Sequence, residues 1–325
     1  EMCIRDSTKK VAQLEASKTF AKDFMARHQL PTASSKTVHN AIDAHAEAAT
    51  MGLPLVLKKD GLAAGKGVVI AQDAETLDET IEKMYADHPD ATVLLEQYLA
   101  GEEASVMALF NGEKRVVLPL SQDHKRRFAN DRGPNTGGMG AISPLPQFND
   151  DQVAAAHQLV DATLKGMQAD GLDGQGVMYI GLIFTPDGPK ILEYNMRFGD
   201  PETQVLLPQI TNDFYQLISD LLANRQPSLT LSDKAYACFV AVNPAYPSSE
   251  LKTVPVIVPT DWPEGTWLPA GVAKSDHGWE RHAGRIFSVV AGAESLPDAV
   301  KAAKTAMEKI QGVLDYRTDI GFHTL

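Results

Sequence analysis

The chain has 325 residues, of which 44% are hydrophobic and 22% are charged, a composition typical of a globular protein with two or three domains. Its formal net charge of −12 argues against general binding to nucleic acid, because most of the surface would repel a phosphate backbone. The only cysteines, Cys3 and Cys238, predict neither a disulfide framework nor a zinc site. No apolar run approaches the roughly 18 residues of a membrane span. We therefore expect a cytoplasmic protein without nucleic-acid or membrane partners.

The first 42 residues predict a helical lead-in to the first domain. Residues 1–7 do not join the helical pattern, and we leave them unplaced as a segment that could be an artefact. From residue 8 to residue 42, apolar side chains recur at helical spacing until Pro31 closes the pattern; they are Val11, Leu14, Phe20, Phe24 and Met25.

Residues 43–104 predict a small α+β domain. Short apolar runs at 53–58 and 67–71 flank the glycine-rich stretch KDGLAAGKG and predict two strands joined by a loop. A helix over 74–85 and a strand over 92–96 complete the domain.

Residues 105–230 predict a larger α+β domain, and residues 231–325 a third one. The larger domain has expected strands at 105–110, 116–119, 177–184 and 190–195, and a helix near 151–168. In the third domain, Ser295 and Asp298 form the N-terminal signal of a helix that we expect Gly312 to end. Its apolar face consists of Val300, Ala303, Met307 and Ile310.

The glycine-rich loop carries the first candidate site. Lys58 ends an apolar strand, and Lys66 lies between Gly65 and Gly67. Glycines let backbone N–H groups face phosphates, and two lysines supply charge for the phosphate oxygens. The loop lacks the GxxxxGK[ST] pattern of a P-loop, and a plain glycine hairpin with a solvated lysine remains the alternative.

A second candidate segment follows the strand over 92–96. The backbone around Glu96, Tyr98 and Leu99 can offer N–H and C=O groups to an adenine edge, and Glu102 or Glu103 can accept the ribose hydroxyls. An acidic turn after a buried strand is the alternative.

A third candidate is the stretch EYNMRFGDPETQ. Glu193 and Asn195 alternate with apolar residues, so on a strand both side chains point to one face. Oxygen ligands at such spacing suit Mg²⁺ that is also held by nucleotide phosphates. Arg197, two residues later, can neutralise charge that develops on a transferring phosphoryl group or a tetrahedral intermediate. A structural turn at 199–201 is the alternative.

Two further stretches, SQDHKR at 121–126 and GPNTGGMGA at 133–141, offer charges and bare glycine backbone. A basic site inside an acidic protein is what an anionic substrate would need. A solvated charge run and a flexible turn-rich loop are the alternatives.

Taken together, these motifs resemble the phosphoribosylamine-glycine ligase family of purine biosynthesis. The resemblance rests on KDGLAAGKGV, LAGEEAS, SQDHKR, GPNTGGMGA, EYNMRFGDPETQ and YRTDIG, which span nearly everything after residue 8. It implies an α+β/α/β protein of the ATP-grasp fold, with a lid over 43–104, a core over 105–230 and a C-terminal α+β domain. It also implies a monomer that phosphorylates glycine with ATP and joins the glycyl phosphate to 5-phosphoribosylamine.

The resemblance also assigns roles to residues. Lys58, Gly65, Lys66 and Gly67 would hold ATP phosphates, while Glu96, Tyr98 and Leu99 would read adenine and Glu103 the ribose. Glu193 and Asn195 would ligate Mg²⁺ or Mn²⁺, and Arg197 would stabilise the acyl phosphate. The residues expected to shape the glycine and phosphoribosylamine site are Asp123, Asn135, Thr136, Met139, Asp200 and Glu202.

The sequence departs from the family pattern in several places. The family begins with a further domain that this sequence does not show, so we expect an incomplete sugar-phosphate site and poor ligation. Phe128 and Ala129 replace an expected glycine and acidic residue, and 243–246 replaces a Gly-Gly-Tyr turn. The alternatives are another ATP-grasp ligase, which uses bicarbonate or a different amino acid, and an inactive nucleotide-binding fragment.

Overall fold

The computed structural model describes residues 8–61, 67–248, 254–258, 266–276 and 278–324. The chain forms two compact units. The first comprises residues up to Val117, Asp150–Arg197 and Asn224–Gln226, and the second comprises Leu118–Asn149, Phe198–Ala223 and the chain from Pro227. Each unit is described by itself.

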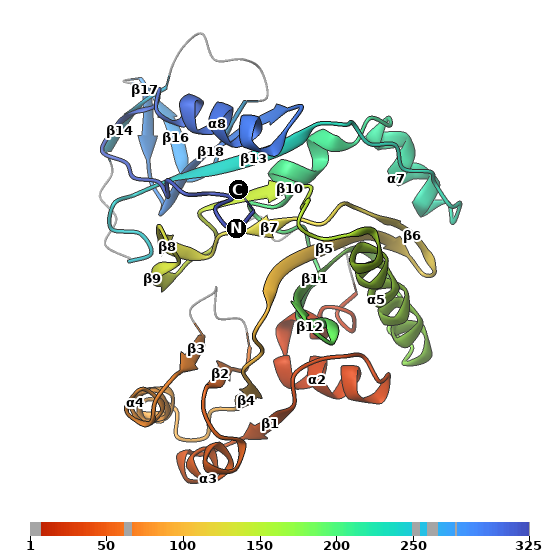
Figure 1. Ribbon diagram of the computed structural model, residues 1–325, viewed down its shortest axis with the longest axis vertical. Coiled ribbons are helices and arrows are strands. Elements are labelled where there is room, and N and C mark those ends of the chain that lie inside the picture. The colour runs from red at the N-terminus through yellow and green to blue at the C-terminus, as the bar shows by residue number, and fades with distance from the viewer. Residues whose placement is uncertain (1–7, 62–66, 249–253, 259–265, 277, 325) are drawn as a thin grey trace. The chain divides into compact units, whose positions relative to one another are not determined.

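The first unit contains a four-stranded antiparallel sheet with the order β1 (Ser35–Val38), β4 (Val93–Gln97), β2 (Leu55–Lys59) and β3 (Val68–Ala71). Helices α3 (Ala41–Met51) and α4 (Ala74–Tyr85) pack against this sheet (Figure 1). Leu57 and Leu95 face each other across β2 and β4 and are fully buried. The apolar faces of both helices and the sheet thus enclose one core.

A second antiparallel sheet of the same unit has the order β12 (Gly188–Asn195), β11 (Gln175–Thr185), β5 (Glu102–Asn111) and β6 (Lys114–Val117). Helix α5 (Asp150–Ala169) contacts β5 and β12, and the short helices α1 (Gln13–Ala16) and α2 (Lys18–Arg27) also contact β12. Ser17 separates α1 from α2 because its side chain accepts a hydrogen bond from the N–H of Phe20 and caps α2.

The second unit is built on a sheet with the order β15 (Trp267–Pro269), β18 (Arg285–Ala293), β13 (Ala235–Val242), β10 (Gly140–Ser143) and β7 (Gln122–Asp123). Helix α8 (Leu296–Met307) packs on β13 and β18 (Figure 1). The unit also contains the hairpin β8 (Arg126–Phe128) and β9 (Arg132–Asn135). The remaining strands are β14 (Val254–Ile257), β16 (Val272–Ser275), β17 (Gly278–Arg281) and β19 (Gln311–Gly312), and the remaining helices are α6 (Thr203–Leu206), the 3₁₀ helix η1 (Leu207–Gln209) and α7 (Phe214–Leu222).

The structure confirms the expected helix over 74–85 and the antiparallel pairing of the strands around the glycine-rich loop. Two predictions were wrong. Residues 35–38, expected in a helical lead-in, form β1 and pair with β4. The last helix ends at Met307, and Gly312 lies instead in β19, opposite Val256. Helices α3 and α7 had not been predicted.

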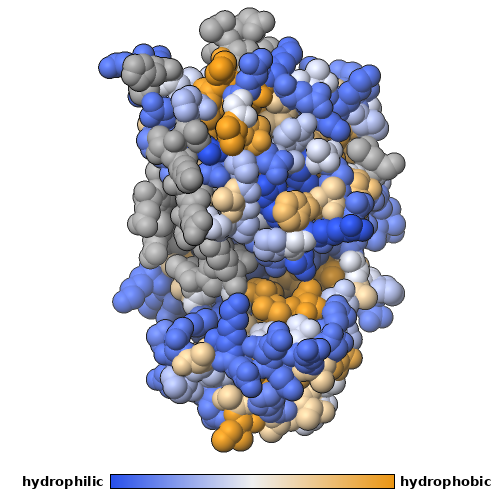
Figure 2. All heavy atoms as spheres, turned by 90° about the vertical axis from the view of Figure 1, so that its left-hand side faces the viewer, coloured by the Kyte–Doolittle hydropathy of each residue, from blue (hydrophilic) through white to orange (hydrophobic). Residues whose placement is uncertain are grey.

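Among the described residues, no helix combines the length and apolar character that crossing a membrane requires. On the face drawn in Figure 2, hydrophilic residues predominate and the apolar residues form small groups. Such scattered apolar side chains are normal for a protein surface.

Candidate functional site

A buried ion-pair cluster lies where β2 and β4 run side by side in the first unit. The carboxylate of Glu96 forms an ion pair with the ammonium of Lys22 at 2.5 Å and another with that of Lys58. All three residues are less than 10% exposed, and burial lowers the pKa of Lys22 against the opposing attraction of Glu96. Two cations therefore share one buried carboxylate, which leaves an excess of positive charge.

A third lysine, Lys18, lies near this cluster. It begins α2, and its ammonium donates to the carbonyl of Gly61 at 2.8 Å. Burial lowers the pKa of Lys18, while the charges of Glu193 and Asp60 act in the opposite direction. Asp60 also fixes the start of α2 by accepting from the backbone N–H of Lys18 at 2.6 Å. Neither Lys18 nor Lys22 was predicted from the sequence, because two lysines four residues apart on one helix are equally typical of a solvated face.

The strand β12 brings the predicted metal ligands to this cluster. The Lys58 ammonium donates to the carbonyl of Leu192 at 3.2 Å, directly before Glu193. Glu193 and Asn195 are half-buried and oppose Gly181 and Tyr179 on β11. A side chain at Gly181 would come within 3.1 Å of Glu193 Cγ, so the glycine leaves room for the carboxylate. The two predicted ligands thus occupy alternate positions of one strand, as expected.

Arg197 lies beside Asn195, as its spacing predicted. Its guanidinium donates to the amide oxygen of Asn195 at 3.3 Å and to the carboxylate of Glu15 at 3.0 Å. Glu15, in α1, also accepts from the backbone N–H of Met196 at 3.0 Å. Glu15 is a further residue that the motifs did not reveal, and it fixes both the backbone and the side chain at the end of β12.

The other predicted nucleotide residues are less closely joined. Gly65 and Lys66 lie outside the described residues, whereas the Gly67 carbonyl accepts from Lys59 at 2.9 Å. Tyr98 is 37% exposed directly after β4, with half-buried Leu99 beside it. Glu103 is exposed near the start of β5. The carboxylate of Glu96 contacts two lysines, and its expected role at the adenine stays a prediction.

In the second unit, Asp123 and Lys125 lie at alternate positions with their charged atoms 4.0 Å apart. The carbonyl of Lys125 accepts from both the backbone N–H and the hydroxyl of Thr136, each at 2.8 Å. Asn135, one residue earlier, is half-buried and pairs with Arg126 in the hairpin. The SQDHKR and GPNTGGMGA stretches are therefore adjacent.

Arg285 links the glycine stretch to Asp200. Its guanidinium donates to the carbonyl of Gly137 at 2.8 Å and to the carboxylate of Asp200 at 2.6 Å. The hydroxyl of Tyr246 accepts from the N–H of Gly137 at 2.8 Å. A side chain at Gly138 would come within 2.4 Å of Pro201. Gly138 therefore serves close packing within the unit, and both polar backbone groups of Gly137 have hydrogen-bond partners.

Met139 and Glu202 are buried beneath this surface. Met139 is 0% exposed, and its backbone N–H donates to the carbonyl of His124 at 2.8 Å. Glu202 is 3% exposed and directly precedes α6. Both residues can shape a substrate site from below, whereas Asp123, Lys125 and Asp200 are partly exposed.

The donor set fits a nucleotide with its metal ion. Within the described parts of the chain, no group of three or more His, Cys, Asp and Glu side chains could hold a metal by itself. Mg²⁺ needs only one or two carboxylates when phosphates and water complete its shell, and Glu193 with Asn195 meets that requirement. The ammonium groups of Lys18, Lys22 and Lys58 are suited to phosphate oxygens.

Comparisons with known proteins agree with this geometry. Residues 16–203 match the family model of the phosphoribosylglycinamide synthetase ATP-grasp (A) domain, and residues 236–323 match the C domain of the same family. Phosphoribosylamine-glycine ligase of Streptococcus pneumoniae serotype 4 is 39% identical over 97% of this chain and 77% of its own length. The Streptococcus pyogenes serotype M18 enzyme is 40% identical over 97% of this chain and 76% of its own length.

Solved structures show the same relationship. The crystal structure of phosphoribosylamine-glycine ligase from Thermotoga maritima has a TM-score of 0.90 and 31% identity, covering 97% of this chain and 81% of that one. The biotin carboxylase domain of Hydrogenobacter thermophilus 2-oxoglutarate carboxylase, with a TM-score of 0.72 and 17% identity, covers 94% of this chain and 68% of that one and shares the fold alone. The chain therefore belongs to the phosphoribosylglycinamide synthetase family and has its ATP-grasp fold.

Proposed function

We propose that this chain uses ATP to join glycine to 5-phosphoribosylamine, giving glycinamide ribonucleotide, ADP and phosphate, a step of purine biosynthesis. The observation that carries the proposal is the buried cluster of Lys22, Glu96 and Lys58 beside the strand that bears Glu193 and Asn195. In a member of this family, that combination of surplus cations and hard oxygen ligands is suited to the phosphates of MgATP.

The first half-reaction transfers a phosphoryl group. A carboxylate oxygen of glycine attacks the γ-phosphorus of ATP, the bond to the β-phosphate oxygen breaks, and ADP leaves with the bonding electrons. Lys18 and Lys58 pair with the phosphate oxygens, and we assign the same task to the loop of Gly65, Lys66 and Gly67. A Mg²⁺ or Mn²⁺ ion held by Glu193 and Asn195 would neutralise phosphate charge.

The second half-reaction forms the amide. The amine nitrogen of phosphoribosylamine attacks the carbonyl carbon of glycyl phosphate, a proton leaves the nitrogen, and phosphate departs. Arg197, held by Glu15, can stabilise the negative charge that develops on the oxygens of the acyl phosphate. A guanidinium presents several N–H donors in one plane, which suits binding to the oxygens of a phosphate group.

Recognition of the substrates is assigned to the remaining residues. For the nucleotide base and ribose we propose the backbone at Tyr98 and Leu99 and the carboxylate of Glu103, and for Glu96 the positioning of the two lysines. For glycine and phosphoribosylamine we propose the second-unit set Asp123, Asn135, Thr136, Met139, Asp200 and Glu202. A cytoplasmic monomer is proposed on the family resemblance alone.

The test measures ADP release and amide formation in the same reaction, with MgATP, glycine and phosphoribosylamine. We expect equal amounts of both products and little ADP when either substrate is omitted. Bicarbonate and other amino acids replace glycine in parallel reactions. ADP release with one of these, and not with glycine, would instead support a different ATP-grasp ligase. Nucleotide binding without turnover would support a non-catalytic fragment, and absence of binding would overturn the proposal.

A further inference from the structure

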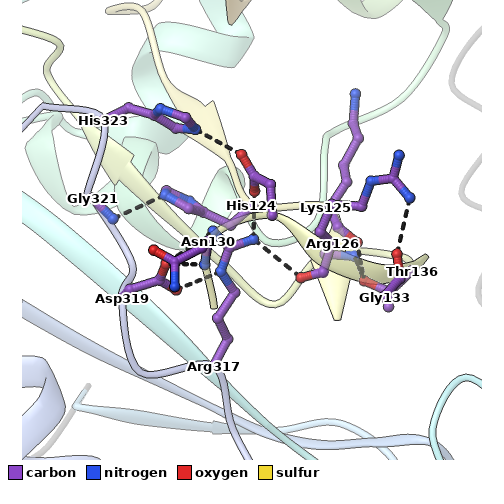
Figure 3. Close-up of polar contacts among 12 residues, drawn as sticks. His124, Lys125, Arg126, Asn130, Gly133, Thr136, Arg317, Asp319, Gly321 and His323 are labelled. Carbon is purple, nitrogen blue, oxygen red and sulfur yellow. Dashed lines mark hydrogen bonds and ion pairs between the residues drawn. The ribbon is translucent and has the colours of Figure 1, made fainter. Parts of the chain in front are cut away.

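Arg317 is a fully buried cation in the segment that follows the last strand of the second unit. Its side chain is 0% exposed and lies between two carboxylates, at 2.8 Å from Asp131 and 2.7 Å from Asp319. It also donates to the carbonyl of Arg126 at 3.1 Å. Figure 3 shows how the guanidinium reaches from the C-terminal segment to the chain beside His124.

Both carboxylates make a further contact between the β8–β9 hairpin and the C-terminal segment. Asp319 accepts from the backbone N–H of Asn130 at 2.7 Å, and Asp131 pairs with His323 at 2.8 Å. Asn130 and Asp131 have φ values of 57° and 51°, the left-handed conformation that most residues avoid. The C-terminal segment thus contacts the two hairpin residues that most need external support.

His124 joins the C-terminal segment by a second route. Its Nε2 accepts from the backbone N–H of Gly321 at 2.9 Å, so the neutral ring carries its proton on Nδ1. The residue is 2% exposed, and its pKa is lowered to about 3 by burial first and then by the charge of Arg317. His124 is therefore an uncharged acceptor at physiological pH.

These contacts meet at one short stretch of backbone. The carbonyls of three successive residues each accept a hydrogen bond: His124 from Met139, Lys125 from Thr136, and Arg126 from Arg317. The side chains of Asp123 and Lys125 project from this stretch. Because this backbone is held by these three bonds, the points from which the two side chains start are fixed.

We propose that Arg317 is a positioning residue that holds Asp123 and Lys125 in the geometry needed to bind the non-nucleotide substrates. The inference rests on the proposed function, since it concerns a residue that assists substrate binding for the same reaction. A guanidinium fixes two carboxylates and a carbonyl in set directions, which a lysine cannot do. A role in stability alone would not require its contacts to converge on the backbone beside these two side chains.

The test compares Arg317→Lys and Arg317→Met with wild type. Arg281→Lys is the matched control, since Arg281 is also buried in this unit, where its guanidinium donates to the Val313 carbonyl away from the 121–139 segment. We expect KM for glycine or phosphoribosylamine to rise about tenfold or more in Arg317→Met, with the KM for ATP unchanged. Arg317→Lys, which keeps the charge, should show a smaller rise, and Arg281→Lys none.

Hydrogen exchange measured by mass spectrometry provides the readout that does not depend on turnover. In Arg317→Met we expect faster exchange over 121–126 and 133–139, with exchange in β2, β4 and β12 as in wild type. Asp131→Asn, a milder change, is the substitute if Arg317→Met does not fold. Unchanged exchange in these segments, or equal KM changes for all three substrates, would overturn the inference. Failure of wild type to form the amide would overturn the proposed function, while exchange would still decide whether Arg317 holds the loop.

Discussion

At the scale of single residues, the charge balance around Glu96 is the least ordinary feature of the first unit. Burying an ion pair is costly unless each charge is compensated, and removing one partner is more damaging than never having had the pair. Here two ammonium groups depend on one carboxylate that is 3% exposed. The carboxylate is therefore harder to replace than either lysine.

We expect Glu96→Gln to lower the free energy of unfolding of the first unit by about 3–5 kcal/mol, because it leaves two buried cations unpaired. Lys22→Met should cost less, since Lys58 and Glu96 remain as a neutral pair. Hydrogen exchange in β2 and β4 during a urea titration measures both. An equal or larger loss in Lys22→Met would contradict the charge argument.

Glu193→Gln tests the proposed metal ligand. The substitution removes a negative charge and keeps the side-chain size, so Mg²⁺-dependent ATP turnover should fall by at least about a hundredfold while the fold is retained. Glu82→Gln, on the exposed side of α4, is the matched control and should have wild-type turnover. Normal turnover with normal Mg²⁺ dependence in Glu193→Gln would exclude this residue as a ligand.

His124 predicts a pH dependence of stability. Its folded-state pKa is about 3, below the unfolded value of roughly 6.5. Between these values the unfolded state binds the proton and the folded state does not, so stability falls with falling pH by up to about 1.4 kcal/mol per pH unit. His124→Gln keeps an acceptor for Gly321 and cannot titrate. The stability difference between wild type and variant should therefore shrink from pH 7 to pH 5, and a constant difference would mean that His124 titrates normally.

At the scale of elements, the sequence was sufficient to predict the end of a helix where a neighbouring residue in the chain caps it. The start of α4 follows from Asp73, whose side chain caps Thr76, and the start of α8 follows from Ser295 in the same way. The end of α8 could not be predicted, because Gly312 looks like a helix terminator and is used in β19 at a φ of 131°. The strand β1 exists because β4 offers it a partner, which is a long-range contact without a local signal.

The residues of the candidate site likewise divide into those that local patterns predict and those that only long-range contacts reveal. Lys58, Glu193 and Asn195 could be found from strand endings and alternation, and the structure brings them together. Lys22 could not, since a lysine in an amphipathic helix is normally solvated, and its burial depends on Glu96 from a strand 74 residues away along the chain. Arg317 belongs to a recognised motif, but only the fold shows which backbone it holds.

The glycine stretch of the second unit gives a prediction at this scale. Gly138 and Gly278 have nearly the same positive φ, at 110° and 111°. An added Cβ would meet Pro201 at 2.4 Å from Gly138, whereas from Gly278 it would meet none of the described residues within 4 Å. Gly278→Ala should cost about 1–3 kcal/mol from backbone strain alone, and Gly138→Ala clearly more. Equal losses in urea unfolding would show that the loop can move away from Pro201.

At the scale of the whole molecule, each compact unit has its own apolar core and its own share of the proposed function. The described residues that we propose for phosphate and metal binding belong to the first unit, and those proposed for glycine and phosphoribosylamine belong to the second. The family models follow a different division, since the ATP-grasp match over 16–203 includes parts of both units. Domains defined by sequence and units defined by packing therefore need not coincide in this fold.

The position of the tryptophans makes the two units experimentally separable. The two tryptophans that the structure describes, Trp267 and Trp279, belong to the second unit, where they lie 5.6 Å apart beside Phe287. Tryptophan fluorescence therefore reports unfolding of the second unit. Hydrogen exchange in β2 and β4 reports the first.

Matched core substitutions use this separation. Leu57 in β2 is 0% exposed and Leu296 in α8 is 6% exposed, so truncating either to alanine should cost its own unit about 2–5 kcal/mol. If the cores are independent, Leu296→Ala lowers the urea midpoint of the fluorescence transition and leaves exchange in β2 and β4 unchanged, and Leu57→Ala does the reverse.

Saturating MgATP should slow exchange in β2 and β4 of Leu57→Ala, because a ligand that binds only the folded state stabilises it by about 2.7 kcal/mol at a hundred times its Kd. If both variants lower the fluorescence midpoint equally, the two cores unfold as one cooperative structure. A substitution that destabilises the proposed phosphate residues would then also destabilise the proposed substrate residues.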